Sequence, residues 1–271
     1  MNFMLAFSSF CDAHFHLFDI LESLGPEELS VFNSLIESKG FSAIDCATDG
    51  EQLEKVHSFF IEHKNMGIYS ACAIHPFHVS FDEIQNKKKL LQLQHLLEQK
   101  KIQIIGECGL DFYTDELKRT MKNQMDVFES QLLLAGKYEK PVVLHIRKAF
   151  SYLNDFLSPL GQLPSVLFHG FGGGPNDLSF IMKHLSNSYF SFGANLLQNS
   201  KKALACIELI PLNRLLLESD APFGPFRDFS VLSYTKQWNQ LIRIVSDIKK
   251  IKPRQLCHVL NQNFVLYLNN E

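Results

Sequence analysis

The sequence has no closely spaced cysteine pair and no long apolar run. Its 271 residues include six scattered cysteines without a Cys-x-x-Cys pair. That usage is typical of reduced thiols, so we expect a cytoplasmic protein. No apolar run approaches the roughly 20 residues that a membrane helix requires, so we expect no membrane association. The opening MNFMLAFSSF lacks the basic region of a secretory signal and leads directly into DAHFH, so we expect no signal peptide.

An excess of either charge is also missing. The 26 basic and 29 acidic residues nearly cancel, which argues against a protein that coats DNA non-specifically. A local patch or a bound metal could still hold a phosphate. We interpret the basic segments NKKKL (86–90) and DIKKIKPR (247–254) as solvated helix faces. Because no basic stripe is interleaved with aromatic residues, we expect any nucleic acid to be contacted over only a few nucleotides.

Short apolar runs alternate with longer amphipathic stretches along the chain. Eight runs of strand type occupy residues 10–16, 41–48, 68–76, 102–110, 141–147, 164–171, 189–195 and 214–220. Eight strands alternating with helices predict a parallel sheet with helical crossovers, and the number favours a (β/α)8 TIM barrel. The alternative is an open α/β sheet, but no Gly-x-Gly-x-x-Gly turn follows the first strand. No linker interrupts the series, so we expect one domain over residues 1–271.

One of the helix candidates, residues 115–140, has a clear apolar stripe. Its members are spaced three or four residues apart, as on one face of a helix. They are Met121, Met125, Phe128, Leu132 and Ala135. This stripe is expected to pack against the sheet.

Polar side chains occur near the C-terminal ends of six strands, where a parallel barrel has its catalytic face. They are Asp12, His14, His16, His75, Glu107, His145, Arg147, His169, Glu218 and Asp220. Alternate residues of a strand share a face, so His14 and His16 point the same way. Two imidazoles side by side on a buried strand pack poorly unless they bind something between them. Six strands that bring such groups to one rim predict a metal site.

Each of these residues has an ordinary structural interpretation when taken alone. A single histidine such as His145 is more often hydrogen-bonded at the rim than a ligand, and Asp220 before Ala-Pro could cap a turn. The set as a whole offers imidazole nitrogen and carboxylate oxygen without thiolate, which suits Mg, Mn, Zn, Fe or Ni. Five or more ligands exceed the need of one tetrahedral zinc. We therefore expect two divalent ions, roughly 3.5–4 Å apart and sharing a water or hydroxide, and we expect hydrolysis as the reaction class.

Motifs over nearly the whole chain resemble those of the TatD-type metal-dependent hydrolases, a branch of the amidohydrolase-like barrels. DAHFHL resembles the opening D-x-H-x-H-L, AIHPF resembles G-x-H-P with Ala73 for glycine, and GECGLDFY resembles G-E-x-G-L-D-Y. Residues 124–149 resemble Q-x-x-x-F-x-x-Q-L-x-L-A … P-V-x-x-H-x-R-x-A. HGFGGG resembles H-C/G-F-S-G, and LLLESDAPF resembles L-L-x-E-T-D-S-P-Y. The glutamate motif and the long stretch are the most specific.

The resemblance implies a centre with six metal ligands. They would be His14, His16, Glu107, His145, His169 and Asp220. The first two histidines and the aspartate would hold one ion, and the last two histidines would hold the other. Glu107 would bridge the ions. Asp220 would also orient the bridging water and take its proton, so Asp220 and Glu107 are the expected catalytic residues.

The resemblance also implies a substrate. His75 and Arg147 are placed where the family meets a substrate phosphate, and an arginine fork suits that anion. Members of the family are mostly magnesium- or manganese-dependent deoxyribonucleases, often exonucleases. We therefore expect hydrolysis of phosphodiester bonds in DNA, of the 3'-5' exonuclease type, by a monomer.

The chain also departs from the family pattern. FRDFSVLSYTKQW stands where many relatives carry an N-E-P-like motif, Gly173 replaces a serine, and the loop after Asp111 is brief. Such loops read the substrate, so hydrolysis of a small amide, ester or lactone is an alternative. Related barrels often bridge their metals with a carboxylated lysine, and Glu107 at that position favours the nuclease branch. A non-catalytic metal-binding or scaffold protein is the third hypothesis, but no expected ligand is missing.

Overall fold

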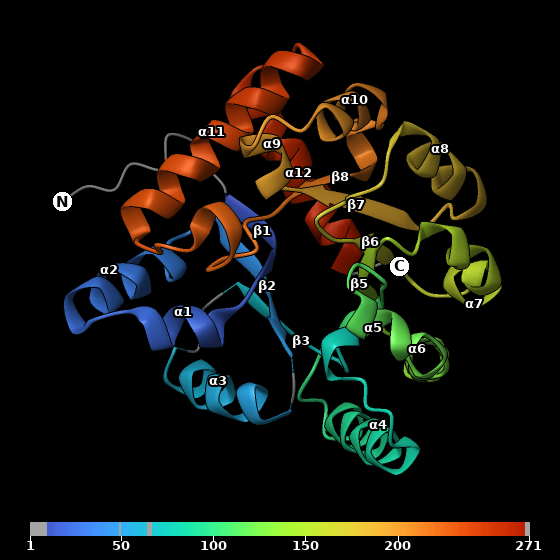
Figure 1. Cartoon of the computed structure of the whole chain (residues 1–271). Helices are drawn as coiled ribbons and strands as arrows, with labels where there is room; N and C mark the ends of the chain where they lie inside the picture. Colours follow the sequence, from blue (N-terminus) through green and yellow to red (C-terminus); the bar gives the residue numbers. More distant parts are fainter. Residues whose placement is uncertain (1–9, 49, 64–66, 269–271) are drawn as a thin grey trace.

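A computed structural model describes residues 10–48, 50–63 and 67–268. Eight parallel strands pair in sequence order into one sheet, which curves into a nearly closed barrel (Figure 1). They are β1 (Phe10–Phe15), β2 (Phe41–Ala47), β3 (Ile68–Cys72), β4 (Ile104–Asp111), β5 (Val142–Arg147), β6 (Val166–Phe168), β7 (Ser188–Phe192) and β8 (Leu215–Leu217). The predicted (β/α)8 TIM barrel is confirmed.

Helices surround the strands, as Figure 1 shows. They are α1 (Leu17–Ser23), α2 (Pro26–Ile36), α3 (Gly50–Glu62), α4 (Glu83–Glu98), α5 (Asp115–Arg119), α6 (Met121–Lys137), α7 (Leu157–Gly161), α8 (Pro175–His184), α9 (Ala194–Leu197), α10 (Lys201–Leu209), α11 (Val231–Lys249) and α12 (Pro253–Leu268). Short 3-10 turns are η1 (Pro76–His78), η2 (Phe150–Phe156), η3 (Leu212–Arg214) and η4 (Gly224–Phe226). No helix in the described ranges is long and apolar enough to cross a membrane. The first nine residues, where we expected no signal peptide, lie outside these ranges.

The helix predicted over residues 115–140 is two helices, α5 and α6, divided at Thr120. The Thr120 hydroxyl donates to the Leu117 carbonyl, a local hydrogen bond that competes with continued helix. Phe128, Leu132 and Ala135 of the predicted stripe are buried, whereas the two methionines are only partly buried. Two glutamines share the buried face instead, and they prove important at the site.

The N-terminal end of the barrel is covered by α12, which crosses the middle of the ring of strands in Figure 1. Asn263 donates to the carbonyl of Leu215 at the start of β8, and the Tyr267 hydroxyl donates to that of Val142 at the start of β5. Apolar side chains from the strands and from α12 fill the interior at this end. Only the opposite end of the barrel is left for a site.

Asp12 joins the first and last strands, a role that differs from the sequence prediction. Its Oδ1 accepts the backbone N–H of Ser219 at 2.9 Å, and its Oδ2 accepts the hydroxyls of Ser219 and Tyr234, each at 2.6 Å. Backbone bonds from Asp220 to His14 and from His16 to Ala221 complete the seam. Asp12 therefore does not reach the rim with the two histidines, as we had expected, because it links β1 to the segment after β8 and to α11.

Two strands have an irregular register immediately around a site residue. The β1–β2 pairing shifts between Asp12 and Phe15, and the β4–β5 pairing shifts between Ile105 and Cys108. Phe15 and Cys108 pack in the large core with residues of the surrounding helices. A bulge changes which face the following side chain takes, and His14 and Glu107 lie inside these two irregular segments.

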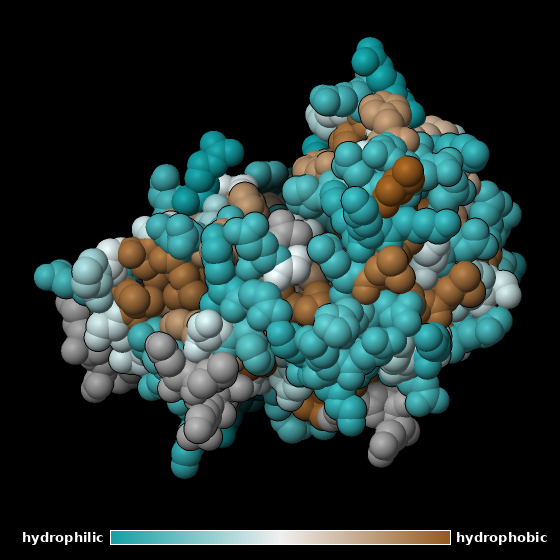
Figure 2. Space-filling model, turned by 90° about the horizontal axis from the view of Figure 1, so that it is seen from below, coloured by the Kyte–Doolittle hydropathy of each residue, from teal (hydrophilic) through white to brown (hydrophobic). Residues whose placement is uncertain are grey.

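The outer surface is mostly hydrophilic on the face drawn in Figure 2. The hydrophobic residues visible there form separate patches. Large contiguous apolar patches mark permanent interfaces, and this face does not carry one over the described residues. The monomeric state stays a prediction.

Candidate metal centre

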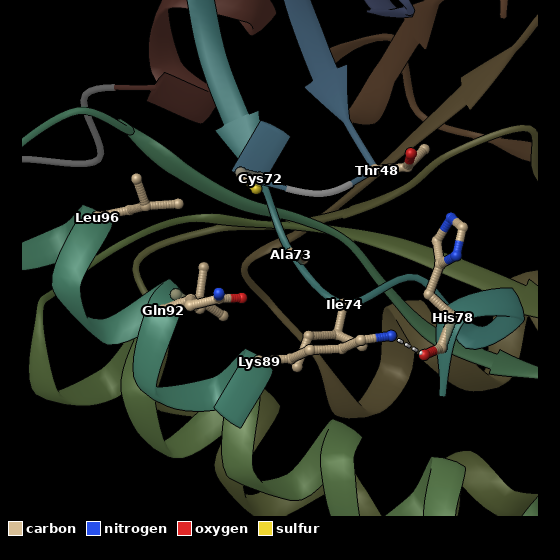
Figure 3. Close-up of a pocket in the computed structure, with 10 residues that line it drawn as sticks. Thr48, Cys72, Ala73, Ile74, His78, Lys89, Gln92 and Leu96 are labelled. Atoms are coloured by element: carbon tan, nitrogen blue, oxygen red, sulfur yellow. Dashed lines mark hydrogen bonds between the residues drawn. The ribbon is translucent and has the colours of Figure 1, made fainter. Parts of the chain in front are cut away.

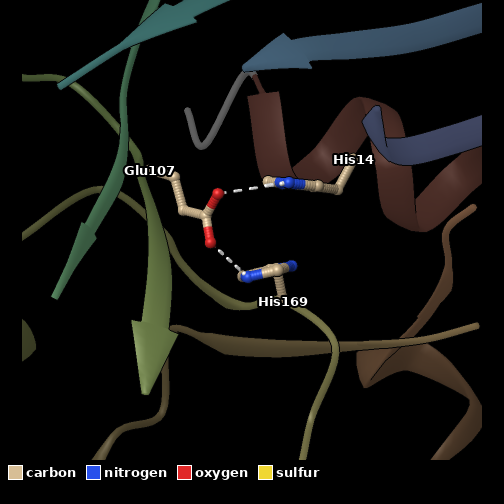
Figure 4. Close-up of side chains that lie close together, drawn as sticks. All are labelled: His14, Glu107 and His169. Carbon is tan, nitrogen blue, oxygen red and sulfur yellow. Dashed lines mark ion pairs between the residues drawn. The ribbon is translucent and has the colours of Figure 1, made fainter. Parts of the chain in front are cut away.

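The six predicted ligands converge at the C-terminal end of the barrel, around the carboxylate of Glu107. Its Oε2 lies 3.4 Å from His14 Nε2, and its Oε1 lies 2.6 Å from His169 Nε2 and 2.6 Å from His145 Nδ1. Figure 4 shows the carboxylate between two imidazoles, with one oxygen facing each. One carboxylate thus joins overlapping groups of candidate ligands, because the ligand atoms of His14, Glu107 and His169 lie within 4.8 Å of one another.

The second acidic residue, Asp220, completes one of these groups. Its Oδ1 lies 3.4 Å from His16 Nε2 and 3.5 Å from His14 Nε2, and the two histidine nitrogens are 3.2 Å apart. This confirms that His14 and His16 point the same way. Asp220 has a φ of 57°, in the left-handed region that few non-glycine residues adopt. Such strain persists at functional sites when the surrounding structure enforces it.

Each ligand histidine has an inner nitrogen that faces the carboxylates and an outer nitrogen that faces away from them. The partner of the outer nitrogen determines whether the inner one is left for a metal. His16 Nδ1 lies 2.8 Å from the backbone carbonyl of Cys46, so this nitrogen carries the proton and donates. His145 Nε2 lies 3.0 Å from Asp111 Oδ2 and donates in the same way. In the neutral ring the inner nitrogen then keeps its lone pair, which is how metal-ligating histidines are oriented.

The outer nitrogens of His14 and His169 have other neighbours, and His169 Nδ1 has no hydrogen-bond partner among the described residues. His14 Nδ1 lies 3.2 Å from the Cys46 thiol, and His169 Nδ1 faces Glu218 Oε1 at 3.5 Å. Glu218 is itself held by the buried Ser191 hydroxyl. With neutral rings that carry the proton on the outer nitrogen, four lone pairs and two carboxylates would meet at one place. Divalent cations fit this donor set, because they supply the shared positive partner.

The electrostatics of the cluster also favour positive charge. Burial raises the pKa of Glu107, but the charges of His169, His75 and His14 outweigh it and hold that pKa well below its usual range. Burial lowers the pKa of His16, but the hydrogen bond and charge of Asp220 outweigh it and raise the pKa to about 9. A cation would compete with protons for these positions, so metal binding should weaken as the pH falls.

His75 and Arg147 lie beside the cluster in a different manner. His75 Nδ1 accepts the backbone N–H of Phe77 at 3.1 Å, so its Nε2 carries the proton and points at Glu107 Oε1, 3.4 Å away. His75 therefore offers a hydrogen-bond donor where the other four histidines offer lone pairs. The Arg147 guanidinium stacks 3.8 Å from the ring centre of Tyr113 and lines both cavities of the site.

Two cavities open on the cluster. One, of about 350 Å³, is lined by His16, Thr48, His75, Phe77, His78 and Phe223 beside the cluster. The other, of about 460 Å³, is lined by Tyr113, Lys148, Asn195 and Lys202 together with glycines of the HGFGGG segment. A smaller cavity of about 130 Å³ lies between α4 and the end of β3, where Lys89 Nζ donates to the His78 carbonyl (Figure 3). It contains none of the metal ligands.

Sequence reasoning missed the residues that hold the ligands in place. Asp111 had no assigned role, although the GLD of its motif was recognised. The two buried glutamines of α6, Gln124 and Gln131, each form a pair of hydrogen bonds with the backbone of one residue. Gln124 binds N–H and C=O of Asp111 at 2.9 and 3.2 Å, and Gln131 binds those of Ile74 at 2.7 and 3.3 Å. The signal available in the sequence was the presence of two glutamines, Gln124 and Gln131, on the helix face that is otherwise apolar.

Histidines and carboxylates gathered at the C-terminal end of a (β/α)8 barrel are typical of a metal-dependent hydrolase. The sequence model of the family described as TatD related DNase matches residues 11–269. The chain belongs to this family.

Individual relatives agree with that assignment. The chain is 30% identical over 222 residues to the uncharacterized metal-dependent hydrolase YjjV of Escherichia coli K12, covering 81% of this chain and 82% of that protein. It is 33% identical over 167 residues to the 3'-5' ssDNA/RNA exonuclease TatD of Pantoea ananatis, covering 59% and 60%. The crystal structure of YjjV superposes with a TM-score of 0.78 at 24% identity over 99% of this chain and 100% of that one.

Proposed function

We propose that this protein uses two divalent ions, Mg, Mn or Zn, to hydrolyse phosphodiester bonds at the 3' end of single-stranded DNA. The observation that carries the proposal is the position of the Glu107 carboxylate, whose two oxygens face different histidines at 3.4 and 2.6 Å. His14, His16 and Asp220 would hold one ion, and His145 and His169 would hold the other. Relatives named as 3'-5' ssDNA/RNA exonucleases support the choice of substrate.

Divalent cations bound here would lower the pKa of water and offset the charge that develops on phosphate. Asp220 is the residue of this chain that can receive the proton of the attacking water. Burial raises the pKa of Asp220, but the neighbouring His16 and His14 outweigh it and lower that pKa, so the carboxylate is ionised. A third of its side chain is exposed at the mouth. The Nε2–H of His75 and the guanidinium of Arg147 are donors for the phosphate oxygens.

The test is an assay of metal-depleted protein after addition of Mg²⁺ or Mn²⁺. The substrates are 5'-labelled single-stranded oligonucleotides, with a panel of esters, amides and lactones in parallel. We expect stepwise shortening of the oligonucleotide from its 3' end. Rapid lactone or ester turnover without oligonucleotide cleavage would contradict the proposal and favour a small-molecule hydrolase. Asp220→Asn should keep part of the bound metal while reducing turnover by at least about a hundredfold, the lower end of what one lost acid–base group costs.

A further inference from the structure

We propose that the two cavities divide the substrate at the scissile bond. In this assignment the base of the terminal nucleotide stacks on Phe77 and Phe223, and the phosphates of the remaining strand bind Lys148 and Lys202. The inference rests on the proposed phosphodiesterase activity, and it adds how the strand lies across the centre.

The smaller of these two cavities has two exposed aromatic rings beside the metal ligands. Phe77 is 55% exposed and Phe223 is 45% exposed, although both rings border a charged centre. The Phe77 ring lies 4.5 Å from that of His75, and the Phe223 ring lies 5.0 Å from that of His16. Aromatic faces left exposed next to phosphate-binding groups are the usual means of holding an unpaired base.

The turn that carries Phe77 is held rigidly, so its exposure is not a consequence of a loose loop. Its backbone N–H donates to His75 Nδ1, and Lys89 Nζ donates to the carbonyl of the next residue at 2.6 Å. The buried Asn86 binds both the N–H and the C=O of Ser80, each at 2.8 Å. These bonds hold the backbone of the turn, so Phe77 is placed beside the centre before a base binds, and such preorganisation lowers the cost of binding.

The larger cavity has the cationic groups. Lys148 and Lys202 line it, and the lining of the aromatic cavity includes no lysine among the described residues. Three carboxylates also line the larger cavity. Asp177 accepts the backbone N–H of Gly174 at 2.8 Å, Glu218 accepts the Ser191 hydroxyl, and Asp220 belongs to the centre itself. Arg147 lines both cavities and so belongs at the scissile phosphate.

The distribution of charge decides which part of the strand enters which cavity. Beyond the scissile phosphate, a terminal 3' nucleotide has a sugar and a base but no further phosphate. The retained strand has one phosphate for every nucleotide, and each needs a cation or water. The cavity without lysine therefore suits the terminal nucleotide, and the cavity with Lys148 and Lys202 suits the rest.

The aromatic half of the proposal is tested with two oligonucleotides of equal length, one ending in a normal 3' nucleotide and one ending in an abasic tetrahydrofuran. Wild-type protein should lose at least fivefold in kcat/KM on the abasic end, as expected for one lost stacking contact. Phe77→Ala and Phe223→Ala should each lower kcat/KM on the normal end by about the same factor. On the abasic end, kcat/KM of each variant should be close to that of the wild type. Phe77→Leu and Phe223→Leu keep an apolar side chain but no aromatic ring, so they separate the loss of stacking from local disorder. The matched control is Phe180→Ala on α8, where the side chain is 38% exposed.

The cationic half is tested with strands of different length. Lys148→Ala and Lys202→Ala should raise KM for an eight-nucleotide strand at least threefold and leave KM for a dinucleotide unchanged, because a dinucleotide has only the scissile phosphate. Equal cleavage of normal and abasic ends by wild-type protein would overturn the stacking assignment, and equal lysine effects on both lengths would overturn the phosphate assignment. If wild-type protein cleaves no oligonucleotide at all, the proposed function fails and this inference fails with it.

Discussion

The carboxylate of Asp111 should control metal affinity without touching the metal. Its Oδ2 accepts His145 Nε2–H at 3.0 Å, and its Oδ1 accepts the backbone N–H of Tyr113 at 2.8 Å. Asp111→Asn replaces one of these oxygens by an NH₂ group, so one of the two donors must lose its acceptor. If His145 keeps the contact by accepting, its proton moves to Nδ1, which faces Glu107 and the position of a metal.

Two independent estimates give the size of this effect. Loss of a carboxylate that orients a ligating histidine typically costs 10- to 100-fold in metal affinity. That range corresponds to about 1.4–2.8 kcal/mol. Leaving a buried hydrogen-bonding group without a partner costs about 1–3 kcal/mol. Because Asp111 is fully buried, water cannot replace the lost partner, and the upper half of the range is expected.

Isothermal titration of the metal-depleted protein with Mn²⁺ measures the effect. The matched control is Asp115→Asn on α5, because that carboxylate is 90% exposed and pairs with Lys118 at 2.8 Å, away from the metal ligands. We expect the control to bind Mn²⁺ like the wild type and Asp111→Asn to bind at least about thirtyfold more weakly, with both variants folded by circular dichroism. An Mn²⁺ dissociation constant for Asp111→Asn within twofold of wild type would show that Asp111 does not orient His145.

Three further substitutions test other parts of the centre. Glu107→Ala should abolish activity and release at least one metal per chain in elemental analysis, and full activity would contradict the bridging role. Arg147→Lys should raise KM with unchanged metal content, because lysine lacks the guanidinium fork, and an unaltered KM would remove Arg147 from the site. Burial raises the pKa of Asp12 from 3.8 to about 7 despite its hydrogen bonds from Ser219 and Tyr234. The folded state therefore favours protonated Asp12, so the contribution of this group to stability is lost as the pH rises from 4 to 7. Asp12→Asn lacks this contribution, so over the same rise its free energy of unfolding in urea should change less unfavourably than that of the wild type.

The strands could be predicted from the sequence, but their ends could not. Apolar runs alternate with amphipathic segments, and that pattern is sufficient for a barrel. The predicted strands at 68–76, 164–171 and 214–220 extended through His75, His169 and Asp220, whereas β3, β6 and β8 end before these residues. His14, Glu107 and His145, by contrast, lie inside β1, β4 and β5. Where a strand ends depends on its pairing with the neighbouring strands, which one run of residues does not show.

The ligands themselves were predictable because histidine and carboxylate groups are conspicuous in apolar strands. The residues that orient them were not, since their partners come from distant parts of the chain. Glu218 reaches His169 from after β8, and Asp111 reaches His145 from the end of β4. Asp12 has the same spacing from His14 as His16 does, yet the shift in register sends Asp12 to the opposite face. Such shifts depend on two strands together, so alternation within one strand cannot predict them.

The metal centre best explains the register shifts in the β1–β2 and β4–β5 pairings. In a regular strand His14 would share a face with Asp12, which bonds to Ser219 and Tyr234 away from the cluster. Glu107 would likewise share a face with Ile105, which packs in the outer core with Cys108. An imidazole or a carboxylate buried without a partner in a hydrophobic layer is strongly destabilising, because it loses its hydrogen bonds to water and gains none in return. The bulges turn both groups toward the rim, where Glu107 and His14 meet at 3.4 Å. The strand backbone has therefore been shaped by the need to gather ligands as well as by packing.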